Sequence, residues 1–416
     1  MKELGKRIVI VLAWRLVAKL RKKHRLKIIA VSGSIGKTST KRAIATVLSQ
    51  APAKVQWQDG NYNDIVSVPL VFFGQTMPSL TNPLAWLKTL LHMNWQIKNY
   101  PYKIVVLELG TDGPGQIAQF GKYLQVDTVV VTPIAPEHME FFDNIEAVAR
   151  EELSVQSYSK TLILHQSIAK TFSDQFSGAY KTYGQNYPAD AHLVMCSEKI
   201  AIIKTKQNEY KFPTQLIGHH QNMNLAAACL VAEDFGLDKQ QVEKGLANIS
   251  AVPGRMQRLK GIKSSTIIDD TYNASPEAVK AALDTLKSLP GTQKIAVLGN
   301  MNELGGLSPM MHEEIGKYCD PNVIDLLITI GSDANQYIAS AAAENGCSVI
   351  KSESPYTIGG TLKNTLEPDS LILLKGSQNG VFLEEAIKPI LADPKDSSKL
   401  VRQTKDWISK KQKAFS

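Results

Sequence analysis

A glycine-rich turn with a single lysine is the segment of this 416-residue chain best suited to chemistry. Its residues are Gly33, Ser34, Ile35, Gly36, Lys37, Thr38 and Ser39. In such a turn the backbone N–H groups point at an anion, the lysine ammonium reaches terminal phosphates and the threonine hydroxyl can ligate Mg²⁺. The turn therefore predicts a phosphate-binding loop.

The elements around this turn are those that a phosphate-binding loop needs. Residues 26–32 are largely apolar and predict a short strand, and residues 38–49 predict a helix whose positive dipole end faces the turn. The alternative is a chance Gly-Lys-Thr in a surface loop, and the strand–turn–helix order argues against it. Val31 stands where the general pattern has glycine, so the loop is a shortened variant.

Two residues that could ligate a metal follow predicted buried strands. Glu108 lies at the end of the apolar run 103–109, and His138 follows the apolar run 127–132. Carboxylate oxygens suit Mg²⁺, which completes its octahedron with water and phosphates. A lone glutamate or histidine is more often structural, but the phosphate loop and the strand-end positions favour metal roles for both.

Length and composition set the class of protein. The length predicts two or three domains, each with its own core. A hydrophobic fraction of 44% and a charged fraction of 21% are typical of a globular chain. The four cysteines lack paired spacing, which indicates a reducing, cytoplasmic compartment and argues against a zinc site or a disulfide framework: Cys196, Cys229, Cys319 and Cys347.

Positive charge is concentrated at the front of the chain. Residues 1–27 hold ten Lys and Arg and one acid, whereas the remainder holds 37 basic and 38 acidic residues. Because the body of the chain is close to neutral, the composition predicts no nucleic-acid partner.

Residues 1–25 predict a basic amphipathic helix. Its uncharged runs are shorter than the roughly 20 residues that cross a bilayer, and no small-residue cleavage site follows them. Two placements stay open. In one, the helix contacts an anionic membrane peripherally, with Arg15, Lys19 and Lys22 near one stripe. In the other, it packs on the phosphate-binding domain and keeps a solvated basic edge.

Apolar runs that alternate with helical stretches predict an α/β fold with mostly parallel sheets. We predict a helix at 1–25, a P-loop central domain at 26–252 and a second, Rossmann-like α/β domain at 253–394. An aromatic, proline-punctuated surface insertion with its own helix interrupts the central domain at about 78–101. The basic tail at 395–416 predicts a solvated helix or a frayed end.

Several motifs in a fixed order, from about residue 28 to 390, resemble those of the Mur ligase family, the ATP-dependent amide-bond ligases of peptidoglycan precursor synthesis. The nearest branch is the MurF type. The resemblance is carried by the shortened phosphate loop, the segments 60–70, 107–110, 131–140 and 218–224, the Pro-Gly-Arg at 253–255, and the segments 269–276, 298–305 and 375–377.

The resemblance implies the cofactors ATP and Mg²⁺, with two magnesium ions. It implies that Lys37 is catalytic, that Thr38 and Glu108 hold one metal, that His138 holds the other, and that Asn224 bonds the adenine. Further nucleotide contacts are implied for Arg255, Asp270, Tyr272 and Asn273, and substrate contacts for Asn61, Asn63, Lys375 and Ser377.

Two positions depart from the family pattern. Glu152 stands where most members carry a lysine whose carbamate helps to hold the second metal. Either Glu152 replaces the carbamate directly or the second metal is bound weakly, and the first outcome is preferred because it keeps a hard oxygen ligand. Gln378 takes a place usually held by arginine.

The implied reaction turns a substrate carboxylate into an acyl phosphate, which the amine of an amino acid or dipeptide attacks. Domain closure about residues 252–255 is expected to accompany it. For the MurF type, the substrates are a UDP-MurNAc-tripeptide and D-Ala-D-Ala. The family's N-terminal UDP-binding domain has no counterpart before residue 26, so we expect the nucleotide-sugar to be held by other segments, including 78–101, or the acceptor to differ.

Two alternatives remain. One is another acid–amino-acid ligase of the superfamily, which adds polyglutamate, modifies a cofactor or acts on a membrane-bound acceptor. The other is a non-catalytic ATP-binding homologue, and the intact set of Lys37, Glu108 and His138 argues against it.

Overall fold

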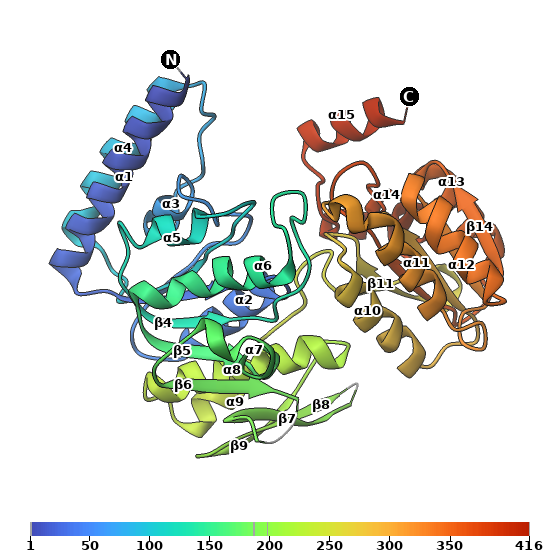
Figure 1. Ribbon diagram of the computed structural model, residues 1–416, viewed down its shortest axis with the longest axis horizontal. Coiled ribbons are helices and arrows are strands. Elements are labelled where there is room, and N and C mark those ends of the chain that lie inside the picture. Colours follow the sequence, from blue (N-terminus) through green and yellow to red (C-terminus); the bar gives the residue numbers. More distant parts are fainter. Residues whose placement is uncertain (1, 186–187, 198, 416) are drawn as a thin grey trace. The chain divides into compact units, whose positions relative to one another are not determined.

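The computed structural model describes residues 2–185, 188–197 and 199–415, which form two compact units (Figure 1). The first unit comprises Met1–Ile134, Phe141–Thr214 and Asn222–Ile249, and the second comprises Ala135–Glu140, Gln215–Gln221 and Ser250–Ser416. Positions 1, 186–187, 198 and 416 fall within the predicted segments 1–25, 26–252 and 395–416 and lie outside the described residues.

The first unit is built on a nine-stranded sheet in the order β2-β3-β1-β4-β5-β6-β7-β8-β9. In this order, the strands from β2 through β1 to β7 pair in parallel, whereas β8 pairs antiparallel with β7 and with β9. The sequence analysis did not predict this antiparallel part of the sheet. The strands are β1 Lys27–Ser32, β2 Val55–Gln56, β3 Ile104–Glu108, β4 Val126–Val131, β5 Ser159–His165, β6 Tyr180–Gly184, β7 Ala191–Cys196, β8 Ile200–Thr205 and β9 Glu209–Pro213.

Helices pack on this sheet, and α2 lies against β1 and β3. They are α1 Lys2–His24, α2 Lys37–Leu48, α3 Val68–Phe73, α4 Pro83–Gln96, α5 Gln116–Phe120, α6 Ile145–Leu153, α7 Gln166–Thr171, α8 His219–Asp234 and α9 Lys239–Ala247. The predicted helix after the phosphate loop is confirmed to within a residue at each end.

Helix α1 belongs to the first unit. Ala13, Trp14, Val17 and Leu20 are buried in its main hydrophobic core, and the Trp14 indole Nε1 donates to the carbonyl oxygen of Ile65 over 2.9 Å. One face of the predicted amphipathic helix therefore packs on the phosphate-binding unit. No helix among the described residues is both long and apolar enough to cross a bilayer.

The second unit has a six-stranded sheet in the order β10-β11-β15-β12-β13-β14, in which β10 pairs antiparallel and the other pairs are parallel. Its strands are β10 Gln257–Lys260, β11 Thr266–Asp270, β12 Lys294–Gly299, β13 Leu326–Ile330, β14 Val349–Ser352 and β15 Leu371–Lys375. Its helices are α10 Pro276–Ser288, α11 Ser308–Tyr318, α12 Ala339–Glu344, α13 Pro355–Thr365, α14 Glu384–Ile387 and α15 Lys405–Ala414. The predicted α/β class with mostly parallel sheets is confirmed.

The C-terminal tail is better anchored than the sequence predicts. Instead of a fully solvated or frayed end, α15 places Lys411 in the interior, where its Nζ lies 2.8 Å from Glu384 and 2.7 Å from Glu385. Just before α15, Arg402 forms a second buried ion pair with Glu384. The sequence of the tail suggests a solvated basic segment, because the acids that pair with Lys411 and Arg402 lie in a different element, α14.

Candidate active site

The phosphate loop joins β1 to α2 and contains two glycines in the left-handed region. Gly33 has φ +111° and Gly36 has φ +87°, conformations that side chains disfavour. A Cβ on Gly33 would meet the backbone of Thr132, and one on Gly36 would lie 2.8 Å from the Asn224 amide nitrogen. Both positions require glycine, and Asn224 on α8 lies directly against the loop.

Backbone groups tie the loop to the residue that follows Thr132. The N–H groups of Ser34 and Ile35 donate to the carbonyl oxygen of Pro133 over 3.0 and 3.1 Å, so these two donors face Pro133. Lys37 Nζ donates to the carbonyl oxygens of Gly33 and Ser34. The N–H groups of the first turn of α2, which lack intrahelical acceptors, are the ones available to an anion.

Glu108 ends β3, which pairs with β1, so its carboxylate arrives beside the loop. Thr38 Oγ1 donates to Glu108 Oε1 over 3.2 Å. Lys41, one helical turn after Lys37, places its Nζ 3.1 Å from Glu108 Oε2, and both side chains are almost wholly buried. Hydroxyl and carboxylate oxygens are the ligands that Mg²⁺ prefers, so Thr38 and Glu108 together fit a magnesium site.

Glu152, near the end of α6, also reaches the loop and is fully buried. Its Oε2 accepts hydrogen bonds from the Ser32 hydroxyl and, over 2.7 Å, from the Gly33 N–H. Its Oε1 lies 4.0 Å from Lys37 Nζ. A carboxylate is thus fixed against the loop at the position where most Mur ligases carry a carbamylated lysine.

Asn63 approaches the end of β3 from the segment between β2 and α3. Its carbonyl oxygen accepts the Gly110 N–H over 2.9 Å, and its side chain lies where a Cβ on Gly110 would project. Asn61 is exposed on the same segment. Of the two predicted substrate residues in this segment, Asn63 is therefore the one close to the Glu108 strand end.

In the second unit the ends of β11 and β15 bring two predicted residues together. Asp270 and Lys375 are register partners, and Lys375 Nζ lies 2.5 Å from Asp270 Oδ2. The same ammonium donates to the carbonyl oxygen of Asn273 over 3.1 Å. The Ser377 hydroxyl accepts the Asn302 N–H over 2.9 Å. Aligned strand ends explain this cluster, since parallel neighbours finish at the same edge.

Arg255 and Tyr272 also meet in the second unit. The Arg255 guanidinium carbon stands 4.3 Å from the centroid of the Tyr272 ring, which is cation–π geometry. Arg402 donates to the carbonyl oxygens of Thr271 and Tyr272 over 2.7 and 3.1 Å. The predicted nucleotide residues of this unit are thus held in place by an arginine from the C-terminal tail.

His138 is described with the second unit, because residues 135–140 are grouped there. Its Nδ1 lies 2.8 Å from Glu303 Oε2, and the hydrogen bond from this histidine lowers the pKa of Glu303. Both residues have positive φ, +53° and +67°, a strained conformation that is more frequent at functional sites. A carboxylate bonded to one ring nitrogen is the arrangement usual for a histidine that ligates a metal through the other.

Asp269 precedes Asp270 in β11 and is fully buried. Its Oδ1 accepts hydrogen bonds from the Thr271 N–H and hydroxyl over 3.1 and 2.6 Å. Burial, with a smaller contribution from the nearby Glu384 and Asp270 carboxylates, raises the pKa of Asp269 to about 6, although the hydrogen bonds from Thr271 act in the opposite direction. Its hydrogen bonds fix the backbone of Thr271 directly after β11.

Two contacts were missed in the sequence interpretation. Lys41 lies four residues after Lys37, and this spacing alone could have placed it on the same face of the helix. Glu303 lies in a segment that was recognised, but nothing local indicates that it pairs with a histidine 165 positions earlier.

A phosphate loop with strand-end carboxylates, followed by a second α/β unit, defines an ATP-dependent ligase of the P-loop type. Comparison with known proteins agrees: residues 31–232 match the Mur ligase middle domain, and residues 254–378 match the Mur ligase, glutamate ligase domain. The chain therefore belongs to the Mur ligase family, and the curated relatives described below are ligases of the MurF type.

Three relatives illustrate the similarity. The UDP-N-acetylmuramoyl-tripeptide--D-alanyl-D-alanine ligase of Synechocystis is 30% identical over 90% of this chain and 76% of its own length. The ligase of the same name from Bacillus subtilis is 30% identical over 88% of this chain and 76% of its length. The MurF ligase from Thermotoga maritima, solved in complex with ADP, is 26% identical with a TM-score of 0.74, covering 92% of this chain and 83% of that one.

Proposed function

We propose that this protein joins D-alanyl-D-alanine to a UDP-N-acetylmuramoyl-tripeptide in peptidoglycan precursor synthesis. The observation that carries the substrate assignment is the 30% identity, over about nine-tenths of the chain, to two ligases named for these substrates. The Lys37, Glu108 and Glu152 groups gathered at the loop support the ATP chemistry.

In the proposed reaction an oxygen of the tripeptide carboxylate attacks the γ-phosphorus of ATP, the bond to ADP breaks and an acyl phosphate forms. The dipeptide amine then attacks the acyl carbon and loses a proton, and inorganic phosphate leaves. Lys37 would hold the terminal phosphates and offset the charge on the phosphoryl oxygens. The N-terminal turn of α2 would hold the phosphates through its N–H groups.

We propose that two Mg²⁺ ions serve this site, with Thr38 and Glu108 holding the first and His138 and Glu152 the second. Magnesium would neutralise phosphate charge there. The hard oxygens of Thr38 and Glu108 fit the first ion, and the Glu303 contact on His138 is the arrangement usual for a ligating imidazole. Among the described residues no three His, Cys, Asp or Glu side chains cluster as a metal site, so phosphates and water would complete each shell.

The remaining predicted roles stay proposals. We propose adenine contact by Asn224, nucleotide contacts by Arg255, Asp270, Tyr272 and Asn273, and substrate contacts by Asn61, Asn63, Lys375 and Ser377. A cytoplasmic enzyme with peripheral membrane contact through residues 1–25 fits the basic exposed face of α1.

Phosphate release by the purified full chain tests the function. With ATP and Mg²⁺, we expect release only when UDP-MurNAc-tripeptide and D-Ala-D-Ala are both present, and a fall of about a thousandfold in Lys37→Ala. Release with glutamate and a folate-like acid instead would assign a polyglutamate ligase. ATP binding without amine-dependent release for any acid–amine pair would assign a non-catalytic homologue. Either result refutes the proposal.

A further inference from the structure

Helix α4 carries two apolar faces, and the first unit covers only one. The covered face packs into the core or against it through Trp86, Leu90, Met93 and, just beyond the helix, Ile97. The other face consists of Leu84, Leu87, Leu91 and Trp95, which are 54–71% exposed. Both sets follow three- and four-residue steps, so they form opposite stripes of one helix.

Helix α1 is divided in the same way. Its covered stripe holds Trp14 and its neighbours in the core, whereas Leu4, Ile8, Val11 and Leu12 are 39–65% exposed. Towards the C-terminal end, the exposed stripe continues as Arg15, Lys19 and Lys22 at the same helical spacing. The stripe is therefore apolar in its first half and cationic in its second.

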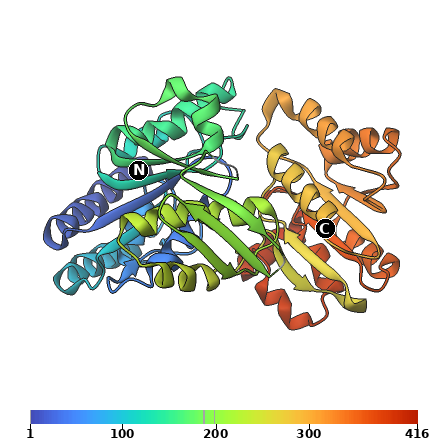
Figure 2. The same ribbon diagram turned by 90° about the horizontal axis from the view of Figure 1, so that it is seen from below.

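The two helices run parallel and side by side, as Figure 2 shows. Lys19 Nζ donates to the Asn94 side chain over 3.1 Å, and Lys23 Nζ donates to the carbonyl oxygen of Lys98 over 3.1 Å. This register brings Ile8 level with the start of α4. We call the exposed stripes together the two-helix surface, and define it by Leu4, Ile8, Val11 and Leu12 of α1 and Leu84, Leu87, Leu91 and Trp95 of α4.

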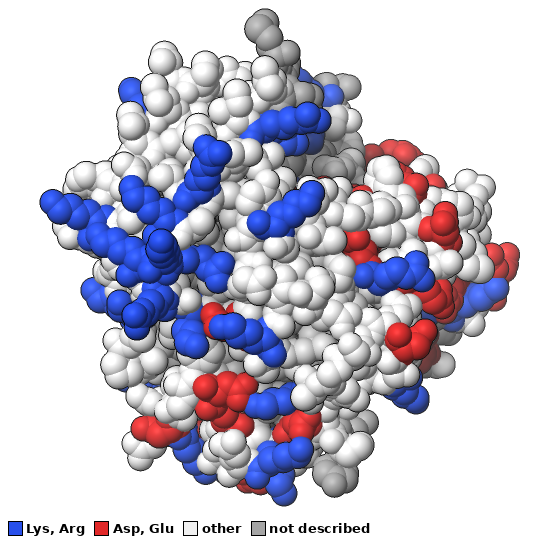
Figure 3. Space-filling view, turned by 60° about the vertical axis from the view of Figure 1, so that its left-hand side comes forward, with Lys and Arg blue, Asp and Glu red and all other residues white. Residues whose placement is uncertain are grey.

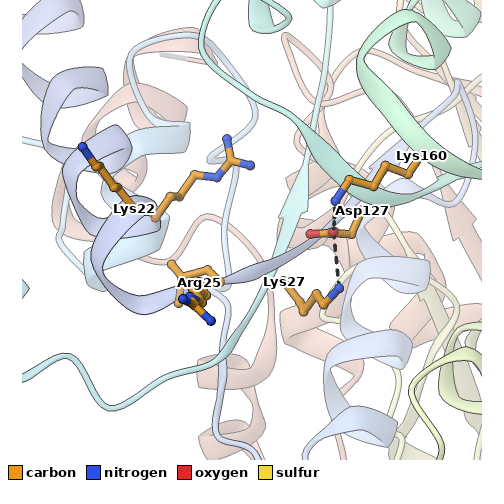
Figure 4. Close-up of a pocket in the computed structure, with 7 residues that line it drawn as sticks. Lys22, Arg25, Lys27, Asp127 and Lys160 are labelled. Atoms are coloured by element: carbon orange, nitrogen blue, oxygen red, sulfur yellow. Dashed lines mark hydrogen bonds and ion pairs between the residues drawn. The ribbon is translucent and has the colours of Figure 1, made fainter.

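Cations gather at the end of this surface. A pocket of about 530 Å³ follows the C-terminus of α1 and is lined by Arg21, Lys22, Arg25, Leu26, Lys27, Asp127 and Lys160 (Figure 4). Asp127, the one acid in the lining, already pairs with Lys160 at 2.8 Å and Lys27 at 3.6 Å. Figure 3 shows Lys and Arg side chains concentrated on the face that carries α1 and α4, with few acidic ones among them.

We propose that the two-helix surface docks on an anionic lipid bilayer, with its leucines and Trp95 in the interfacial region and its cationic end on lipid phosphates. Charge selects this occupant, because a second copy of the same face would oppose cation to cation. Tryptophan and leucine above a basic rim are the composition of interfacial helices. The inference rests on the peripheral membrane contact proposed above and assigns its main apolar element to α4.

Vesicle flotation of the full chain tests the proposal. We expect binding to vesicles that contain phosphatidylglycerol, weak binding to phosphatidylcholine alone, and release by high salt. Leu87→Glu/Leu91→Glu should lower the partition coefficient at least about tenfold. Val194→Glu is the control, because it also replaces an apolar side chain by an acid, at a half-exposed position of β7. This variant should bind vesicles like the unchanged chain. Lys19→Gln/Lys22→Gln should weaken binding to anionic vesicles only.

Equal binding by the Leu87/Leu91 variant and the control would overturn the proposal, as would no binding by the unchanged chain. Concentration-dependent self-association that the Leu87/Leu91 change abolishes, without vesicle binding, would assign the surface to a second copy instead. Phosphate release with soluble substrates, measured on the same preparations, separates the two questions. If the protein ligates the substrates but does not float with vesicles, only the membrane inference is refuted. If it floats but does not ligate, only the proposed function is refuted.

Discussion

Replacing Glu152 by glutamine should abolish most activity while leaving a folded protein. The change keeps the shape of the side chain and removes its charge. Glu152 accepts two hydrogen bonds, from the Ser32 hydroxyl and the Gly33 N–H, and faces Lys37 at 4.0 Å. Both hydrogen bonds end on Oε2, so the amide oxygen of glutamine can take that position and accept both as weaker, neutral bonds, while the amide NH₂ replaces the oxygen that faces Lys37.

The magnitudes follow from these contacts. Weakening two charge-assisted hydrogen bonds lowers the free energy of unfolding by about 2–3 kcal/mol, which is about 4–12 °C in melting temperature. The attraction between Glu152 and Lys37 is about 4 kcal/mol before desolvation, at an effective dielectric constant of ~20. Losing most of it, together with an oxygen proposed to hold metal, should lower kcat at least about a hundredfold.

Glu151 provides a matched control. It is the adjacent residue, is also buried, and accepts the Gly115 and Ile117 N–H groups over 2.7 and 2.6 Å, away from the phosphate loop. Because these two bonds use different oxygens, glutamine turns an NH₂ toward one of the N–H groups, so Glu151→Gln should lower the melting temperature by at least as much and leave kcat unchanged. Phosphate release as a function of Mg²⁺ concentration, with thermal melting of both variants, measures each effect. If Glu152→Gln keeps kcat within about threefold and the same Mg²⁺ dependence, the role proposed for Glu152 is wrong.

Three further changes have definite outcomes. Lys41→Met removes the ammonium that lies 3.1 Å from the buried Glu108 carboxylate, and denaturant titration should show a free energy of unfolding lower by about 3 kcal/mol. The double variant Lys41→Met/Glu108→Gln should recover part of this loss. Equal losses in the single and double variants would refute the pairing. Gly33→Ala drives a Cβ into the backbone of Thr132 at φ +111° and should abolish nucleotide binding measured by calorimetry, so retained binding would contradict the loop geometry. The raised pKa of Asp269, about 6, means that the folded state holds this proton more tightly than the unfolded state, so its contribution to stability is lost as pH rises from about 4 to 6. Asp269→Asn should therefore raise the melting temperature at pH 7.5 and leave it nearly unchanged near pH 4, and a shift that does not depend on pH would exclude this cause.

Local signals were enough for the elements that lie within one stretch of chain. The turn from 33 to 39 follows a strand and opens a helix, because glycines at Gly33 and Gly36 permit φ values that no other residue adopts easily. The helix after the turn was predicted to within a residue of its observed bounds, Lys37–Leu48, since the order of strand, turn and helix is a local feature. The antiparallel strands β7 to β9 were missed, although the alternating burial of β9 is a period that sequence reasoning can detect.

The sequence by itself determined the α/β class, the phosphate loop and the membership of the Mur ligase family, because these depend on residue types at fixed spacing along the chain. Only the tertiary structure decided that Lys41 neutralises Glu108, that Glu152 lies on the Gly33 N–H, and that α4 leaves a second apolar face uncovered. The two contacts join residues from different elements, and the exposure of α4 depends on what packs around it. Strand order and helix packing bring such residues together, and neither is encoded in local spacing.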